Sequence, residues 1–339
     1  QVAVRWGMYG IGWHAGLLMA PALRRAQNTE LRAVCSRDMG RAKEFAGRFE
    51  VPMAYDSYDA MLADGDIDAV YLATPNNLHR EHTEKAAAAG KHVLVEKPMA
   101  LTEADCQAMI EACQRAKVRL GVCFQNRHHP AHMEARRMVL GGEVGEVLRA
   151  SAEFSVNPPR MPWKEWRWDL TQAGGAAIMA IGVHAFDLLR FVLGREALAV
   201  AAFSDEESSN RHVDEIMTCA FRFQGGTQAL ALYGLHIPDA RNNLDIHGSQ
   251  AHVVGVGTIG AVYRGTLTVS RGDVRTEVAY PHLHPETGMF ERLIESFNES
   301  VVEGKEPSAT GYDGLEVCRM TTAALASARE GRVVAIRPA

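Results

Sequence analysis

The stretch GMYGIGWHA, residues 7–15, decides the fold, and it closes an apolar run that begins at Val2. Its two central glycines form a G-x-G pair, and Ala15 stands where a third small residue lets a helix pack closely on a strand. A strand, a turn without side chains and a helix in this order let a pyrophosphate approach backbone N–H groups at the positive end of the helix. We therefore expect a dinucleotide to contact Gly10, Ile11, Gly12 and Trp13. The alternative is a tight turn without a ligand.

Strand and helix patterns alternate through the first 124 residues. The strand-like runs are Leu31–Cys35, Ala69–Ala73, Val93–Val95 and Leu120–Phe124, and the helical ones are Met39–Phe49, His79–Ala89 and Glu103–Ala116. The run Ala69–Ala73 is apolar throughout, as in a strand buried on both faces of a parallel sheet. The short connections predict an α/β fold, with residues 1–124 forming an NAD(P)-binding Rossmann domain around a doubly wound parallel sheet.

The pattern changes in residues 125–339. Helical spacing recurs at Ala131–Leu140, Gly175–Leu193, Thr287–Val302 and Gly311–Ala328. Between Val200 and Ala279, short β-like stretches are separated by Gly, Asn and Asp, and Val333–Ile336 is a last strand. Such hairpin-like runs predict an α+β domain with a large open, mostly antiparallel sheet, used for substrate binding and oligomerisation.

Composition excludes several classes of protein. Lys and Arg number 36 and Asp and Glu number 41, so the net charge is 36 − 41 = −5. This excludes the concentrated basic face of a nucleic-acid binder. Six scattered cysteines without a C-x-x-C pair indicate reduced thiols and a cytoplasmic protein. Residues 6–23 carry no charged side chain, but their four glycines and Pro21 argue against a signal peptide or a membrane helix, and we expect neither.

The end of the second strand bears on cofactor choice. An NAD site usually has Asp or Glu there to bind the ribose 2′-hydroxyl, whereas this strand ends in Ser36-Arg37. A hydroxyl and a guanidinium suit a 2′-phosphate, so we expect NADP, with NAD as the alternative. Asp38, one residue further, is expected to point away. If Arg37 is merely a solvated surface charge, this preference disappears.

Two polar motifs follow the next strands, where the carboxyl ends of parallel strands form a ligand crevice. They are TPNNLH, residues 74–79, and VEKP, residues 95–98. With these motifs, the chain resembles the glucose–fructose oxidoreductase, inositol dehydrogenase and rhizopine catabolism family. The resemblance also includes G-x-G-x-x-A, a GG-x₆-G-x-H-x-x-D segment at Gly174–Asp187 and the closing SAR-x-GR at Ser327–Arg332. The matches span nearly the whole chain in order.

The resemblance implies NAD(P)-dependent hydride transfer to or from a sugar, keto sugar or cyclic polyol. It also implies a cis Lys97–Pro98 peptide bond, with Lys97 and His184 as catalytic residues that contact the substrate oxygen and exchange its proton. Further expected cofactor contacts are Thr74, Pro75, Asn76, His79, Glu96 and Lys97.

The chain departs from the family at one position. Many members have Asp four residues before the catalytic His, and this chain has Ala180 there. Three alternatives stay open: Lys97 and His184 suffice, another carboxylate such as Asp169 or Asp187 serves, or the protein is catalytically weak. Asp187 is placed to orient His184 or to pair with Arg190.

A loop rich in Trp and basic residues offers further candidates. Trp166 and Arg167 match a W-R pair that lies near the nicotinamide in relatives, and we expect Trp163, Asp169 and Arg127 to contact the substrate, with Gln125 a weaker candidate. The alternative is a packed surface loop. Hydride transfer needs no metal, and no Cys or carboxylate completes a ligand set with His128, His129 and His132, so we expect no metal.

The sequence thus predicts a sugar or polyol oxidoreductase. An NAD-dependent inositol-type dehydrogenase and a non-catalytic, NADP-sensing regulator on the same fold are the alternatives. An open sheet leaves a broad face to cover, and the family associates through its C-terminal sheet, so we expect a homodimer or homotetramer.

Overall fold

The computed structural model describes residues 2–157 and 164–337, and its chain divides into two compact units. One unit comprises Gln1–Gln125 with Glu286–Leu315, and the other comprises Asn126–Pro285 with Glu316–Ala339. The first break between the units follows Gln125, one residue beyond the expected end of the Rossmann domain at residue 124. The segment Glu286–Leu315 differs from expectation, because it returns to the first unit instead of staying in a continuous second domain.

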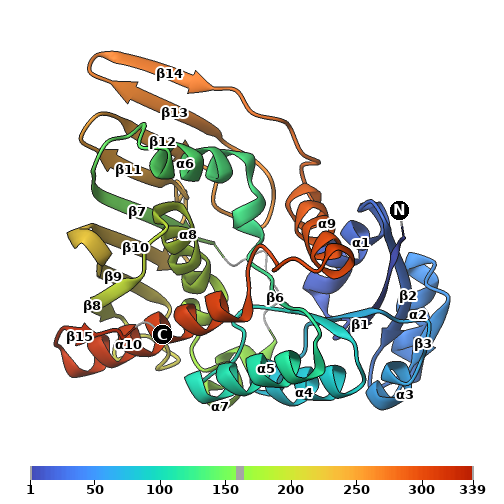
Figure 1. The fold of residues 1–339 in the computed structure, drawn as a ribbon. Coiled ribbons are helices and arrows are strands. Elements are labelled where there is room, and N and C mark those ends of the chain that lie inside the picture. Colours follow the sequence, from blue (N-terminus) through green and yellow to red (C-terminus); the bar gives the residue numbers. More distant parts are fainter. Residues whose placement is uncertain (1, 158–163, 338–339) are drawn as a thin grey trace. The chain divides into compact units, whose positions relative to one another are not determined.

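The first unit is built on a six-stranded parallel sheet in the order β3-β2-β1-β4-β5-β6 (Figure 1). Its strands are β1 Val4–Tyr9, β2 Thr29–Cys35, β3 Met53–Tyr55, β4 Ala69–Leu72, β5 His92–Val95 and β6 Leu120–Val122. All four residues of β4 are buried, as its apolar sequence predicts. The doubly wound Rossmann architecture is confirmed.

The helices of this unit are α1 Ala20–Arg25, α2 Met39–Phe49, α3 Tyr58–Leu62, α4 His79–Ala88, α5 Glu103–Ala116 and α9 Gly288–Glu303. The sequence patterns placed α2 and α5 correctly, and each helix has a capping side chain at its start and a left-handed residue at its end. The first helix differs from expectation: a π-helical turn, Ala15–Met19, precedes α1. Pro21 has no N–H to donate to the carbonyl of Leu17, which accounts for the irregular turn.

Helix α9 joins the first unit through specific buried contacts. The Trp6 indole Nε1 donates to Asn298 Oδ1 at 3.0 Å, and Asn298 Nδ2 donates to Thr29 Oγ1 at 2.7 Å. The ring of Phe297 lies 5.4 Å from that of Trp6, and a Cβ on Gly121 would come within 2.8 Å of the Phe297 ring. These contacts explain why a segment distant in sequence belongs to this unit.

The second unit contains a nine-stranded sheet in the order β14-β13-β12-β11-β7-β10-β9-β8-β15. Its strands are β7 Val147–Ser155, β8 Ala197–Ser204, β9 Ile216–Phe223, β10 Gln228–Gly234, β11 Leu244–Gly248, β12 His252–Val256, β13 Thr266–Arg271, β14 Val274–Val278 and β15 Val334–Ala335. Only the β7–β10 pair is parallel among the described strands of this sheet, so the expected mostly antiparallel sheet is confirmed. Strand β7 lies outside the span in which the sequence predicted strands.

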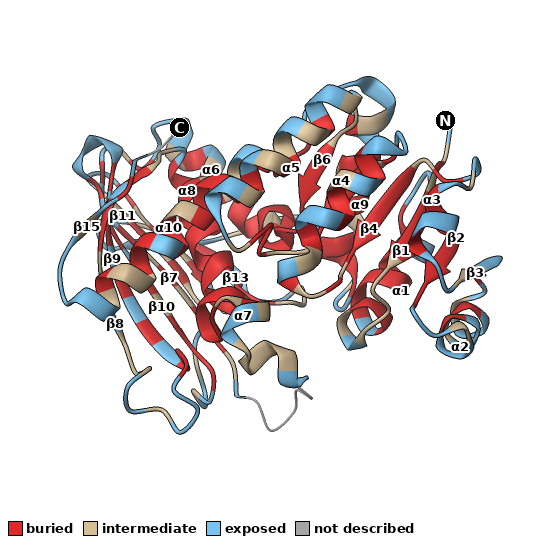
Figure 2. Ribbon diagram, turned by 90° about the horizontal axis from the view of Figure 1, so that it is seen from below, coloured by how far each residue is buried: buried red, intermediate tan, exposed pale blue. Residues whose placement is uncertain are grey.

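Helices cover one face of this sheet, as Figures 1 and 2 show. The covering helices are α6 Pro130–Leu140, α8 Val183–Leu193 and α10 Gly311–Glu330, whose first five residues group with the first unit, while the short helix α7 Leu170–Ala173 precedes α8 in the chain. Helix α8 packs on β7 and β10. The helical stretch Leu170–Leu193 is long and apolar enough to cross a membrane, but 89% of its apolar window is buried inside the structure, so packing in the core accounts for its composition.

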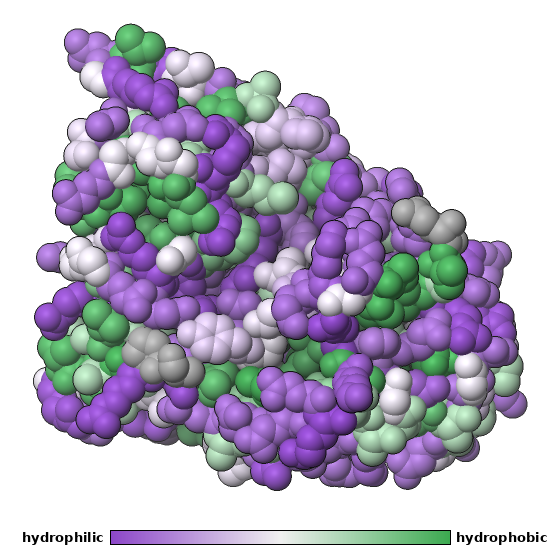
Figure 3. Space-filling model, in the orientation of Figure 1, coloured by the Kyte–Doolittle hydropathy of each residue, from purple (hydrophilic) through white to green (hydrophobic). Residues whose placement is uncertain are grey.

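The opposite face of the sheet is not covered by helices, and side chains along a strand point alternately to this face and to the buried one. Along β9, every second residue is buried and the residues between are exposed, as expected for a strand with one packed face. Surface apolar residues also occur elsewhere. The face in Figure 3 is mostly hydrophilic with separate apolar patches, and Met133 and Leu140 of α6 are each more than half exposed.

Candidate active site

The turn after β1 has the backbone geometry that a pyrophosphate site needs. Gly10 has φ +100°, and a Cβ there would lie 2.4 Å from the carbonyl group of Ala73, so only glycine fits. A Cβ on Gly12 would meet open space, so the fold itself does not require glycine at this position. Open backbone at the start of a helix is what a phosphate approaches, and these residues fit a dinucleotide. Trp13 follows and is 44% exposed.

The end of β2 presents a hydroxyl and a cation. Asp38 caps α2, with its Oδ1 accepting from the backbone N–H of Arg41 at 2.8 Å. The carboxylate is therefore turned into the helix, as expected. Ser36 is buried and accepts from the Asp38 N–H at 3.4 Å, which leaves its hydroxyl hydrogen available. Arg37 is exposed, and no hydrogen bond or ion pair to another residue of the described chain engages its guanidinium.

His79 holds together the two loops that carry the predicted cofactor contacts. Its ring is fully buried, with Nε2 2.9 Å from the carbonyl oxygen of Thr74 and Nδ1 2.9 Å from that of Pro98. The Thr74 hydroxyl lies 2.9 Å from His82 Nδ1. Burial lowers the pKa of His79. An enclosed ring presents no surface to a ligand, so His79 is a positioning residue. Thr74 and Asn76 are also mostly buried, and Pro75 is half-buried.

Glu96 is the centre of a second group of contacts. Its carboxylate accepts from the Tyr71 hydroxyl at 2.8 Å and from the Lys97 backbone N–H at 3.2 Å, and it lies 3.7 Å from His14 Nδ1. The Lys97–Pro98 peptide is cis, which confirms the prediction. Lys97 is half-buried. Glu96 thus orients the backbone of Lys97, the predicted catalytic lysine, and its neighbour is His14, for which no role was predicted.

His184 belongs to the second unit and lies on α8. It is 4% exposed, and its ring centroid is 5.6 Å from that of Phe154. A second π-helical turn, Ile178–Gly182, precedes α8 and contains Ala180. Such turns occur often at functional sites.

The side chain of Asp214 caps the start of this helical stretch, and the sequence patterns did not identify this role. Its two carboxylate oxygens accept from the backbone N–H groups of Ala176 and Ile178, each at 2.6 Å. Asp214 is 2% exposed, and burial raises its pKa to about 6 against the opposing effect of these hydrogen bonds. Asp214 is therefore a remote cap that fixes the start of the helix bearing His184.

Two ion pairs differ from expectation. Arg127 pairs with Asp187 through Nε at 2.9 Å and Nη2 at 2.5 Å, and the two residues are 6% and 1% exposed. Arg190 pairs with Glu196 at 2.7 Å. A bidentate buried pair holds both groups in place, so the structure gives Arg127 a structural role in place of the expected substrate contact.

The loop before α7 contains the remaining candidates. Arg167 stacks on Trp166, with its Cζ 4.8 Å from the ring centroid. Asp169 caps α7, accepting from the Thr171 N–H at 2.9 Å and from Gln172 Nε2 at 2.7 Å, and its hydrogen bonds lower its pKa. Its carboxylate is thus engaged within the loop, unlike the expected substrate contact. Trp163 lies outside the described residues.

Two of the three neighbouring histidines have structural roles. His129 Nδ1 accepts from the Ala131 N–H at 3.1 Å and so caps α6, while its Nε2 donates to the Arg264 carbonyl at 2.8 Å. His132 lies between the Asn126 carbonyl and the Thr258 hydroxyl. Burial lowers the pKa of both rings. Gln125 and His128 are also buried.

Comparison with known proteins identifies the class. Residues 4–124 match the oxidoreductase family with an NAD-binding Rossmann fold, and residues 132–254 match the GFO/IDH/MocA C-terminal domain. The chain belongs to this GFO/IDH/MocA oxidoreductase family, as its motifs indicated.

Three relatives illustrate the family. The chain is 30% identical to 1,5-anhydro-D-fructose reductase of Ensifer adhaerens over 98% of both chains. It is 30% identical to D-xylose 1-dehydrogenase (NADP(+)) 2 of Haloferax volcanii over 96% of this chain and 99% of the relative. A crystal structure of aldose-aldose oxidoreductase from Caulobacter crescentus with glycerol superposes with a TM-score of 0.89 at 28% identity, covering 98% of this chain and all of the other.

Proposed function

We propose that the chain is an NADP(H)-dependent oxidoreductase that transfers a hydride between the nicotinamide and a carbon of a sugar, keto sugar or cyclic polyol. The observation that carries the cofactor choice is the end of β2. There the Ser36 hydroxyl hydrogen and the Arg37 guanidinium are available to a ligand, while Asp38 is held in the cap of α2. The relatives act on sugars, which supports the substrate class.

The expected preference for NADP over NAD follows from the contact between Arg37 and the 2′-phosphate. A 2′-phosphate that gains a charge-assisted hydrogen bond from Arg37 gains about 1.5–3 kcal/mol, which is roughly a 10- to 150-fold effect on affinity. An NAD ribose gains nothing comparable, because the nearby carboxylate of Asp38 already accepts from the Arg41 N–H.

The test is kcat/KM for NADPH and NADH with a panel of keto sugars, and for NADP and NAD with sugars and polyols. Ser36→Asp combined with Arg37→Ile should reverse the preference. Asp38→Asn is the matched control, since Asn also caps a helix and removes only the charge; the ratio should stay within about threefold. A wild-type preference for NAD overturns the proposal and favours the inositol-type alternative. NADP binding without turnover of any substrate favours the regulator.

The catalytic roles follow from the chemistry. When bound, the nicotinamide supplies the hydride or accepts it. The Lys97 ammonium donates a hydrogen bond to the substrate oxygen, and its backbone is oriented by Glu96. The His184 imidazole exchanges the proton of the substrate hydroxyl, a role suited to histidine because the unperturbed pKa of this residue type lies nearest to neutrality.

We also propose that the protein is a homodimer or homotetramer that associates through the uncovered face of the nine-stranded sheet. That face carries exposed apolar side chains, with Phe203 78% exposed and Ile216 and Leu230 each above 40%. Exposed apolar groups that are close together usually mark an interface. Phe203→Asp should dissociate the assembly in sedimentation velocity. A wild-type monomer at micromolar concentration contradicts the proposal.

A further inference from the structure

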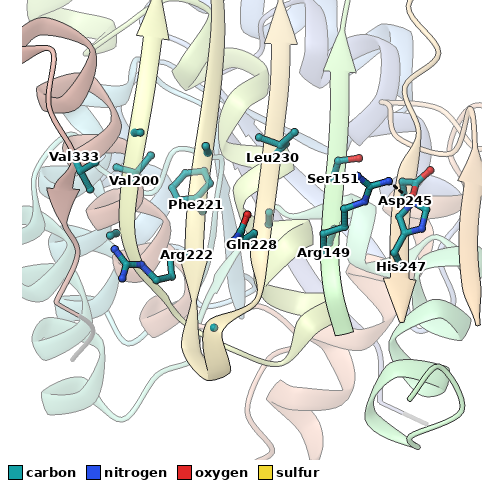
Figure 4. Close-up of a pocket in the computed structure, with 16 residues that line it drawn as sticks. Arg149, Ser151, Val200, Phe221, Arg222, Gln228, Leu230, Asp245, His247 and Val333 are labelled. Carbon is teal, nitrogen blue, oxygen red and sulfur yellow. Dashed lines mark hydrogen bonds and ion pairs between the residues drawn. The ribbon is translucent and has the colours of Figure 1, made fainter. Parts of the chain in front are cut away.

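One group of metal-ligating side chains includes none of the residues described above for the candidate active site. It consists of Asp245 and His247 on β11 and His252 on β12. The three are between 29% and 34% exposed and lie on the uncovered face of the sheet. Figure 4 shows Asp245 and His247 beside Arg149 at one side of a groove of about 720 Å³, whose other side contains Val200, Val333 and Arg222.

The pairing of the strands brings the three groups together. His247 and His252 are direct cross-strand partners in the antiparallel β11–β12 pair, and Asp245 is two residues before His247, so it projects from the same face. The two imidazole rings stack at 3.8 Å with an angle of 12°. Nε2 of His247 and Nε2 of His252 lie 2.9 and 2.8 Å from the same oxygen, Oδ1 of Asp245.

The distances are close to those of a coordination site. Zn²⁺ binds His nitrogen and carboxylate oxygen at about 2.0–2.2 Å, so two ligand atoms at a tetrahedral angle are roughly 3.4 Å apart. The observed contacts to Oδ1 are about half an ångström shorter, and all three ligand atoms lie within 4.8 Å of one another. Because the two rings stack nearly parallel, one imidazole must turn out of the stack before both Nε2 atoms can point at a single ion.

The turn that joins the two strands is held rigidly. A Cβ on Gly248 would lie 2.0 Å from the carbonyl oxygen of Val144, so the backbone there is tightly packed. Ser249 and Gln250 donate their backbone N–H groups to the carbonyls of Glu146 and Val144, at 2.8 and 2.9 Å. The ligand set is therefore carried by a fixed hairpin, and little ordering is required on binding.

The hydrogen bonding of His247 is unbalanced without an ion. Its Nε2 faces the carboxylate of Asp245 at 2.9 Å and also the Nη2 donor of Arg149 at 3.4 Å. A neutral imidazole nitrogen either donates or accepts, so it cannot satisfy both neighbours. A cation between Nε2 and Oδ1 satisfies both ligand atoms at once and removes the conflict with the Arg149 donor.

We propose that Asp245, His247 and His252 form a site for one divalent ion of the Zn²⁺ class, with its remaining coordination positions open. Two imidazoles and one carboxylate suit Zn²⁺, Co²⁺ and Ni²⁺ and do not suit Mg²⁺ or Ca²⁺, which prefer oxygen ligands only. The site is separate from the hydride-transfer chemistry, for which we expected no metal.

The test is binding of Zn²⁺ and Co²⁺ to the tag-free, metal-stripped full chain, by equilibrium dialysis with metal analysis and by the visible absorption of Co²⁺. One ion per chain is expected. His247→Gln and His252→Gln should each weaken binding by roughly tenfold or more. His236→Gln is the matched control, because His236 also lies 2.9 Å from a carboxylate, that of Glu215, but without a second histidine; it should leave binding unchanged.

A charge variant gives an independent test in the opposite direction. Arg149→Gln removes the cation beside the site and should tighten binding by roughly three- to tenfold. Arg222→Gln, on the same face but on β9, should have no effect. Absence of binding at micromolar ion overturns the proposal, as does binding that survives both histidine variants or responds equally to His236→Gln. Circular dichroism and Tm of each variant establish that it is folded.

Discussion

Removal of the Asp214 carboxylate is expected to destabilise the second unit strongly. In Asp214→Ala, the backbone N–H groups of Ala176 and Ile178 lose their acceptor, and both lie where water does not reach them easily. Each unsatisfied buried donor costs about 1–3 kcal/mol, so the free energy of unfolding should fall by about 2–6 kcal/mol. At about 3 kcal/mol, the Tm of a unit of this size falls by roughly 6–12 °C.

The control for this prediction is Asp169→Ala. Asp169 also caps a helix, but it is only half-buried, so water replaces its carboxylate and the loss should be about 1 kcal/mol, or roughly 2–4 °C. Asp214→Asn should lie between the two, since it keeps one acceptor oxygen and turns an amide N–H toward the second donor. Thermal unfolding followed by near-ultraviolet circular dichroism measures all three. Equal small losses for Asp214→Ala and Asp169→Ala refute the assignment of Asp214 as a buried cap.

Three further predictions concern catalysis and acid stability. Lys97→Ala should lower kcat by roughly 10²–10⁴ with little change in NADP affinity, and full activity of the Lys97→Ala, His184→Ala double variant in steady-state assays contradicts the catalytic roles. Ala180→Asp should move the pH–rate profile upward by raising the pKa of His184, with kcat within about tenfold of wild type; an unchanged profile contradicts it. The pKa of His129 is lowered to about 4, so the folded state disfavours its protonation, and about 3 kcal/mol of stability present above pH 6.5 should be lost as pH falls to 4. His129→Asn, which still caps α6 but does not titrate, should reduce that loss of unfolding free energy between pH 7 and pH 4.5 in urea unfolding, and an unchanged loss contradicts its assignment to His129.

Local signals predicted most of the regular structure. Helices α2 and α5 begin and end at the residues that their sequence patterns predicted, and β4 lies within the predicted apolar run of residues 69–73. Strand β7 was not predicted, because strands of the second sheet were expected only after Val200. Its buried residues Ala150, Ala152 and Phe154 nevertheless alternate with less buried ones. The prediction of a cis Lys97–Pro98 bond came from the family resemblance and not from a local signal.

Partner choice within the site was not predictable from spacing alone. The sequence offers Asp187 two neighbours, His184 and Arg190. Only the fold shows that Asp187 pairs with Arg127 and that Arg190 pairs with Glu196. His79 looked like a ligand-facing side chain because it follows a strand end, yet its ring is enclosed between two backbone carbonyls. Both cases depend on residues brought together by tertiary structure, to which periodicity and motif spacing are insensitive.

The same reasoning explains why the buried and exposed polar clusters deserve different interpretations. Arg127 with Asp187 is a charge-balanced pair, and its removal from water is compensated by bidentate hydrogen bonds. Asp245 with His247 and His252 is half-exposed, and one of its nitrogens faces a donor and an acceptor together, so its contacts are not mutually satisfied. A satisfied buried pair stabilises the fold and offers nothing to a ligand. An unbalanced set of ligand atoms on a rigid hairpin is instead the arrangement that an added cation completes.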